Sequence, residues 1–291
     1  MTQREDPLDR LRREIDRIDD ALHDLLMRRT AAVESIREVK RTQGDAILRP
    51  AREAEVLRRL VARHHGPFSK HALVRIWREI MAAQTRVQGP FSIAVFAPAG
   101  RAELWDIARD HFGSTTPSRR HETTRGVLRA VGEGEATVGV LPLPSEDDGD
   151  PWWPALAGRE PHAPSIVARL PFAPPEMRGG PQALAVGLLT QERSAHDHSF
   201  IVVETDGGTS RRTLASALAA AGLDSLFLAH REAHGSDGDL FLAEIGDFVG
   251  RADPRLAKLF ASDNPPIRRI VPAGGYALPL AEQDLAAGER T

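Results

Sequence analysis

The sequence predicts a multidomain protein: an all-α three-helix domain that forms an intertwined dimer, then an α/β region, then an α+β module with the order βαββαβ. Three observations predict this fold class. Residues 8–41 carry apolar side chains three and four positions apart, without an interrupting proline or glycine. After Gly89 and Pro90, apolar runs typical of strands alternate with helical patterns. From residue 199 onward these signals follow the order βαββαβ. We therefore place the domains at 1–90, 91–198 and 199–291.

The first domain contains a helix that is too long for a small monomer. Its apolar stripe extends over about 50 Å at the rise of an α-helix, whereas a domain of about 90 residues has a radius of gyration of only about 12–13 Å. Helices expected over 51–64 and 69–88 cover part of the stripe. A second copy of the chain is the natural cover for the rest, so we predict an intertwined homodimer. The stripe consists of Leu8, Leu11, Ile15, Ile18, Leu22, Leu25, Ala32 and Ile36.

The other two regions are predicted from apolar runs and turn residues. In the second region we expect strands at 91–98, 137–143, 165–170 and 183–190 and helices at 101–112 and 124–132. Trp152 and Trp153, which lie between prolines, are interpreted as a hydrophobic plug under a loop. In the third region we expect strands at 199–205, 225–232, 239–249 and 267–272, helices at 210–221 and 253–261, a turn at 235–238 and a loose tail from 282.

The composition excludes several classes of function. The chain of 291 residues has no cysteine, which excludes disulfide scaffolds, thiolate metal sites and cysteine nucleophiles. It has no apolar run of ~18 residues and no apolar segment at its start that resembles a secretory signal. We therefore expect a cytoplasmic protein with no membrane partner. No basic stripe interleaved with aromatic residues suggests nucleic acid, and the histidines at 64–71 and 196–198 are interpreted as structural, so we expect no metal.

Polar side chains occupy several positions of the helical stripes where apolar ones belong. Arg29 and Lys40 are three turns apart on one face, about 16 Å along the axis. Cations that face a helical core are costly without an anion, although either one alone could reach solvent or pair with an internal carboxylate. The whole set predicts a pocket for a small polyanion such as a dicarboxylate, which arginine binds with two parallel hydrogen bonds. The set consists of Arg29, Lys40, Arg52, Glu53, Gln84 and Gln88.

Residues 7–88 resemble the all-helical chorismate mutases. The stretches that carry the resemblance are PLDRLRREIDRIDDALHDLLMRRTAAV, the lysine of REVK, RPAREAEVLRRL and IWREIMAAQTRVQ. The resemblance implies conversion of chorismate to prephenate in a helix-swapped dimer. A unimolecular pericyclic rearrangement needs no cofactor, only a substrate held in its reactive conformer and fixed donors where charge develops on the ether oxygen.

The resemblance also implies a role for each matching residue. Arg29 and Arg52 are expected to bind substrate carboxylates. Arg12, about 25 Å along the helix from Arg29, is expected to serve the site of the other copy across the dimer. Lys40 and Gln88 are expected to donate hydrogen bonds to the ether oxygen of the breaking C–O bond.

The hydroxyl side of the expected site is less regular. Glu53 is expected to accept a hydrogen bond from the substrate hydroxyl. Arg49, which we expect among the substrate-binding residues, stands where the family usually has an aspartate ahead of the Arg-Glu pair, so the hydroxyl side departs from the family's pattern. Gln84 stands where the family often has a serine, and its amide can still donate to a carboxylate.

The rest of the chain resembles two further families. Residues 91–143, through FSIAVFAPAG and VLRAVGEGEATVGVLPL, resemble the start of prephenate dehydratase, but the Pro-Ile-Glu-Asn-Ser signature reads PLPSE at 142–146. The Thr-Arg-Phe motif has no counterpart, so we predict a degenerate region without dehydratase activity. Residues 199–280 resemble an ACT domain, which implies an amino-acid effector or, alternatively, a module that only dimerises.

Chorismate mutase is therefore the predicted function. An isochorismate pyruvate-lyase on the same fold is one alternative. A non-catalytic regulatory partner of an aromatic-pathway enzyme is the other, and Arg49 is the residue that favours it.

Overall fold

The chain divides into two compact units. The computed structural model describes residues 6–43, 46–146, 149–158, 163–174, 180–232, 238–260 and 267–286. The first unit is Met1–Leu48 with Ala83–Pro90, and the second is Arg49–Ala82 with Phe91–Thr291. Among the described helices, none combines the length and the apolar character of a membrane-spanning segment.

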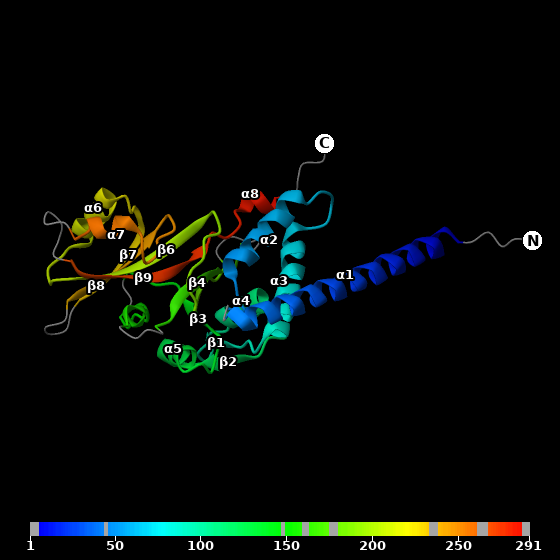
Figure 1. Cartoon of the computed structure of the whole chain (residues 1–291), viewed down its shortest axis with the longest axis horizontal. Helices are drawn as coiled ribbons and strands as arrows, with labels where there is room; N and C mark the ends of the chain where they lie inside the picture. Colours follow the sequence, from blue (N-terminus) through cyan, green and yellow to red (C-terminus); the bar gives the residue numbers. More distant parts are fainter. Residues whose placement is uncertain are drawn as a thin grey trace, which may run out of the picture. The chain divides into compact units, whose positions relative to one another are not determined.

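The first unit is built on α1 (Pro7–Gln43), a continuous helix of 37 residues that appears in dark blue in Figure 1. The carboxylate of Asp6 accepts a hydrogen bond from the amide of Leu8 at its start. The last turns of α3 (Lys70–Gln88) complete the unit, and Arg37 donates to the carbonyl of Val87. The large apolar side chains at 8, 11, 15, 18, 22 and 25 are 50–57% exposed. The helix therefore presents an apolar stripe that no described residue covers.

The second unit begins with α2 (Pro50–Arg63) and the larger part of α3. Pro50 starts α2, where its fixed φ suits the first turn and its missing N–H has no intrahelical role. These helix segments pack against later parts of the chain rather than only against each other. Their shared core consists of Ala54, Leu57, Val61, Val74, Met81, Phe172, Leu280 and Leu285.

A nine-stranded sheet forms the centre of the second unit, in the order β2-β1-β3-β5-β4-β9-β6-β8-β7. β1 is parallel to β2 and β3, and β4 is parallel to β9, whereas the other neighbours are antiparallel. The strands are β1 (Ile93–Phe96), β2 (Ser118–His121), β3 (Val138–Pro142), β4 (Ser165–Leu170), β5 (Ala183–Gly187), β6 (Asp197–Thr205), β7 (Ser225–Arg231), β8 (Asp239–Ile245) and β9 (Ile267–Ala277).

Helices pack against this sheet, and three of them begin at a residue whose side chain caps the first turn. Thr123 caps α5, Ser210 caps α6 and Asp253 caps α7, each by a side-chain oxygen that accepts a backbone N–H. α4 and α5 pack on β1 and β3, and Figure 1 shows α6 and α7 beside β6–β9. The helices are α4 (Glu103–Phe112), α5 (Thr124–Gly132), α6 (Arg211–Ala221), α7 (Pro254–Lys258), α8 (Glu282–Leu285) and a 3₁₀ turn at Trp153–Ala157.

Successive side chains of β6 point to opposite faces of the sheet and belong to two separate hydrophobic cores. Ile201 and Val203 belong to the core under α6 and α7, whereas Phe200 and Val202 belong to the core on the other face. Trp152 and Trp153 lie in this second core with 4% and 1% of their surface exposed. The interpretation of the two tryptophans as a hydrophobic plug is confirmed.

The two expected regions 91–198 and 199–291 share one sheet, because β4 and β9 pair at Ile166 and Gly274. Gly274 has φ +88°, and a Cβ there would lie 2.2 Å from the carbonyl oxygen of Ile166. Only glycine therefore permits this contact. The boundary at 198–199 stays a prediction, since the sheet runs across it.

Most expected elements are present, and the order βαββαβ of the third region is confirmed. Two expectations for its end are wrong. β9 continues to Ala277 instead of ending at 272, and the expected loose tail contains α8, whose Leu285 is 5% exposed. Residues 233–237 of the expected turn at 235–238 lie outside the described residues.

Candidate functional site

Two of the expected site cations lie on one face of α1. Apart from Thr30 and Val33, Arg29 and Lys40 are the only side chains between residues 6 and 40 that are half-buried rather than exposed. Burial lowers the pKa of the Arg29 guanidinium. Within the described residues no carboxylate or other acceptor pairs with it. Lys40 donates through Nζ to the carbonyl of Ala46 at 2.7 Å. With respect to the described part of the chain, Arg29 is thus a half-buried cation without an anionic partner, which favours binding of an anionic ligand.

Two glutamines from the last turns of α3 belong to the same unit. Gln84 is 6% exposed, and its Nε2 donates to the hydroxyl of Thr30 at 3.3 Å. Gln88 donates to the carbonyl of Gln84 at 3.5 Å. The Oε1 atoms of both amides are buried without a partner among the described residues. Buried amide groups nearly always have hydrogen-bond partners, so these two Oε1 atoms are available as acceptors for a ligand. The oxygen and nitrogen of each amide are assigned from its hydrogen bonds.

Arg12 lies far from this group on α1. Its side chain is exposed and pairs with Asp9 of the previous turn at 3.2 Å. Such a surface pair contributes little, so it leaves Arg12 able to exchange its partner.

The remaining expected site residues lie in the second unit. Arg49, just before α2, forms an ion pair with Glu192, with its NH2 nitrogen 3.0 Å from Oε1. Arg52 is exposed and pairs with Glu55 on its own helix at 2.8 Å. Arg49 therefore carries a carboxylate partner from a distant loop, at the position where the expected aspartate is missing.

Glu53 is paired inside the second unit. Its Oε2 accepts a hydrogen bond of 2.7 Å from NH1 of Arg78, and the two side chains are 17% and 6% exposed. Burial raises the pKa of Glu53, and the charge and hydrogen bond of Arg78 oppose this rise. Arg52 and Glu53 are adjacent in the sequence, but the Arg52 side chain is exposed, whereas the Glu53 side chain is only 17% exposed.

Arg78 lies in an apolar and basic environment. Its guanidinium carbon lies 5.1 Å from the ring centroid of Phe172. Arg78, Phe172 and His111 of α4 line a small cavity of about 10 Å³. Burial and the charge of Arg78 hold the pKa of His111 well below its usual value. The imidazole is therefore neutral near pH 7, and Glu53 is the only acidic partner of Arg78 among the described residues.

Arg78 is absent from the expected site because the sequence indicates another buried face for α3. Steps of four residues back from Gln84 lead to Ile80 and Ile76, which would make that face apolar, but Ile76 is 44% exposed. The buried face instead begins with Val74, Arg78 and Met81, at spacings of four and three, and continues through Ala82, Gln84 and Thr85. A cation between two apolar residues of one helical face is the signal that could have found the pair.

A second polar cluster crosses the strands β4, β6, β8 and β9. Arg169 donates to the hydroxyl of Tyr276 at 2.7 Å, and His198 lies 2.9 Å from Oε1 of Glu244. Tyr276 also donates to Glu244. Burial alone would raise the pKa of Glu244, but the hydrogen bonds from His198 and Tyr276 and the charge of Arg169 lower it overall.

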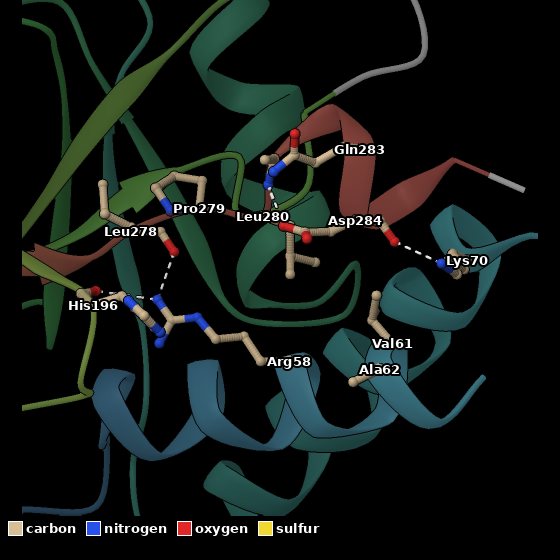
Figure 2. Close-up of a pocket in the computed structure, with 11 residues that line it drawn as sticks. Arg58, Val61, Ala62, Lys70, His196, Leu278, Pro279, Leu280, Gln283 and Asp284 are labelled. Carbon is tan, nitrogen blue, oxygen red and sulfur yellow. Dashed lines mark hydrogen bonds between the residues drawn. The ribbon is translucent and has the colours of Figure 1, made fainter. Parts of the chain in front are cut away.

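A cavity of about 730 Å³ lies between α2, α3 and the segment before α8 (Figure 2). Its cations are already bound by the chain. Arg58 donates to the carbonyls of Ser194, His196 and Leu278, and Lys70 donates to the carbonyl of Asp284. The arrangement joins α2 to two loops of the sheet. Neither in this cavity nor at any other place in the described ranges are three histidines or carboxylates grouped so that they could hold a metal ion.

Comparison with known proteins identifies the helical segment. A family described as "Chorismate mutase type II" matches residues 11–89. The bifunctional chorismate mutase/prephenate dehydratase of Pseudomonas aeruginosa is 30% identical over 150 residues, which are 50% of this chain and 41% of that protein. The protein of the same name from Neisseria gonorrhoeae is 31% identical over 138 residues, 47% of this chain and 37% of that protein. The matches therefore span about 40% of the length of these curated relatives.

Two solved structures are also similar. The superposition with the prephenate dehydratase of Streptococcus mutans covers 65% of this chain and 98% of the dehydratase chain, with 14% identity and a TM-score of 0.45. The prephenate dehydratase of Arthrobacter aurescens, solved in complex with L-Phe, covers 64% and 90%, with 13% identity and a TM-score of 0.46.

The two resemblances expected for residues 7–143 are confirmed. The N-terminal segment is a helical chorismate mutase type II domain, and the chain continues into an α/β region similar to prephenate dehydratase, since the matched relatives extend beyond residues 11–89. The degenerate state of that region, the ACT-like module and the role of each site residue stay predictions.

Proposed function

We propose that this chain is a chorismate mutase, an isomerase that converts chorismate to prephenate in aromatic amino acid biosynthesis. The observation that carries the proposal is the match of residues 11–89 to the chorismate mutase type II family. Half-buried Arg29, which has no anionic partner among the described residues, supports it independently. A dicarboxylate substrate would supply the missing anion.

The proposed catalysis relies on positioning and fixed donors. Arg29 and Arg52 bind carboxylates of chorismate and hold its reactive conformer. Lys40 and Gln88 donate to the ether oxygen, on which negative charge develops as the C–O bond breaks. The donor atom of Gln88 is Nε2, which bonds the carbonyl of Gln84 at 3.5 Å in the chain itself and would turn from it to the ether oxygen. No covalent intermediate and no external proton donor are required.

The remaining contacts concern the substrate hydroxyl and the second carboxylate. Glu53 accepts the hydroxyl, and Gln84 donates to a carboxylate. Arg49, paired with Glu192, takes no part in the hydroxyl contact that the usual aspartate would make.

We further propose that the enzyme acts as a homodimer in which Arg12 of the partner subunit binds the substrate. The exposed stripe on α1, with six large apolar side chains half exposed, supports this assembly because a monomer would leave it in water. The weak surface pair of Arg12 with Asp9 is compatible with its transfer to a substrate carboxylate.

The dehydratase-like region is proposed to be catalytically inactive, because its signature reads PLPSE at 142–146. An amino-acid effector of the C-terminal module and a cytoplasmic location also belong to the proposal.

One assay tests the proposal. The purified full chain is incubated with chorismate, loss of absorbance is followed, and the product is identified by NMR; prephenate is expected. Lys40→Ala and Arg29→Ala are expected to lower turnover by about 10²–10³, whereas Arg28→Ala, an exposed neighbour, keeps it. Parental rates in both variants would refute the site. If isochorismate is supplied and salicylate and pyruvate are formed, the chain is instead an isochorismate pyruvate-lyase. If neither compound is turned over, the chain is a regulatory partner.

A further inference from the structure

The ion pair between Arg78 and Glu53 brings a cation from α3 to a carboxylate of α2. The bond joins NH1 of Arg78 to Oε2 of Glu53 at 2.7 Å. Arg78 is almost inaccessible, with a side chain 6% exposed, whereas the Glu53 side chain is 17% exposed. A ligand can therefore reach Glu53 but not Arg78. The adjoining cavity, of about 10 Å³, is too small for a substrate.

We propose that Arg78 is a positioning residue for Glu53: it holds the carboxylate in its charged form by binding Oε2, so that Oε1 is presented to the substrate hydroxyl. This inference rests on the proposed function, which places Glu53 at the hydroxyl. Arg78 does not touch the substrate itself. It acts by fixing both the orientation and the charge of the group that does.

The physical basis is the cost of a buried carboxylate. Burial alone disfavours the charged form of Glu53 and raises its pKa. A carboxyl group that becomes protonated loses one acceptor site and turns its own O–H toward the nearest acceptor. The charge and hydrogen bond of Arg78 oppose this protonation.

The other charged groups around the pair do not replace Arg78. His111 on α4 is held neutral near pH 7. Arg169 on β4 lines the small cavity but pairs with Tyr276 and Gln182. On α2 itself, Arg52 is engaged by Glu55. Among the described residues, Arg78 is thus the one cation bound to the Glu53 carboxylate.

The test is the pH dependence of kcat/KM for chorismate. Arg78→Gln is expected to move the acid limb of this profile to higher pH, by about one unit or more, because Glu53 then protonates more readily. One unit corresponds to about a tenfold loss of kcat/KM at a pH on that limb. Arg78→Lys keeps the charge and is expected to keep the wild-type acid limb, but to lower kcat roughly tenfold with KM unchanged, because a single ammonium fixes the carboxylate less well.

Two controls separate positioning from folding. Arg75→Gln removes an exposed arginine of the same helix, which pairs with Asp110, and is expected to leave the profile unchanged. In a Glu53→Gln background, Arg78→Gln is expected to cause no further shift of the acid limb. Far-UV circular dichroism monitors folding, and Arg78→Lys carries the test if Arg78→Gln does not fold.

The outcomes are distinguishable from those of the proposed function. A folded Arg78→Gln protein with the wild-type acid limb, a shift that persists without Glu53, or an Arg78→Lys protein with wild-type kcat each overturns the inference. A parent without chorismate turnover overturns the proposed function instead. In that case the ionisation of Glu53 is followed by carboxyl ¹³C NMR. Arg78→Lys is expected to keep the wild-type titration, and an unchanged titration in Arg78→Gln overturns the charge-holding role of Arg78.

Discussion

Replacing Arg58 with methionine is expected to destabilise the second unit by roughly 2–5 kcal/mol. The NH1 nitrogen of Arg58 donates to the carbonyl and hydroxyl oxygens of Ser194 at 2.9 and 3.2 Å. Its NH2 nitrogen donates to the carbonyls of His196 and Leu278 at 3.1 and 2.8 Å. One guanidinium thus joins α2 to the loop before β6 and to the segment after β9.

The magnitude follows from four hydrogen bonds of a charged donor. Each contributes about 1.5–3 kcal/mol when well formed, but removing the cation from water offsets a large part of this gain, as the lowered pKa of Arg58 indicates. Methionine lacks the guanidinium, whose carbon lies 5.8 Å from the ring centroid of Phe172, so this contact is lost as well. The carbonyl oxygens that lose their donor account for the remaining loss.

The assay is urea unfolding followed by tryptophan fluorescence, which reports on the second unit because all four tryptophans of the chain, Trp77, Trp105, Trp152 and Trp153, belong to it. With a slope of about 2–3 kcal/mol/M, the midpoint is expected to fall by about 1–2 M. Arg59→Met, an exposed neighbour on the same helix, serves as the matched control and should shift the midpoint little. Equal midpoints for the two variants would refute the reasoning.

Three further predictions concern assembly, catalysis and pH. Ile18→Glu places a charge on the exposed stripe of α1 and is expected to weaken the dimer at least about 100-fold, because burying an unpaired carboxylate costs several kcal/mol; sedimentation showing an unchanged dimer would contradict it. Lys40→Arg is expected to lower chorismate turnover about 10–100-fold, because a planar fork replaces a compact donor; kinetics at wild-type rates would remove the argument. Glu244 has a folded-state pKa below its ordinary 4.5, so its contribution to stability is present above pH 4.5 and is lost as pH falls through the lower, folded-state value. Unfolding at several pH values should therefore show a weaker dependence of stability on pH for Glu244→Gln than for the parent. Equal pH dependence in the two proteins would count against a stabilising role of the Glu244 hydrogen bonds.

Local signals predicted the helical part well. An uninterrupted period of three and four gave α1, and Pro50 and Gly89 gave boundaries within a residue or two of those observed. The same period placed Arg29 and Lys40 on one face, and both are half-buried there. These features depend on residues close together in the chain, which is why a sequence pattern contains them.

Contacts between distant residues were not predictable in this way. The pairing of β4 with β9 joins two regions that the sequence separates, and it depends on the space that Gly274 leaves beside Ile166. The Arg78–Glu53 pair depends on which face of α3 is buried, and several apolar faces of that helix were compatible with its sequence.

The sequence by itself determined the order of the elements and the chemical character of the helical domain, because periodicity, caps and misplaced cations are local properties. Only the tertiary structure decided which partner each charge has: Glu192 for Arg49, Arg78 for Glu53, and three backbone carbonyls for Arg58. The physical reason is that a buried charge is stabilised by whatever group folding brings within hydrogen-bond distance, and residues 25 to 220 positions apart in the chain supply those groups here.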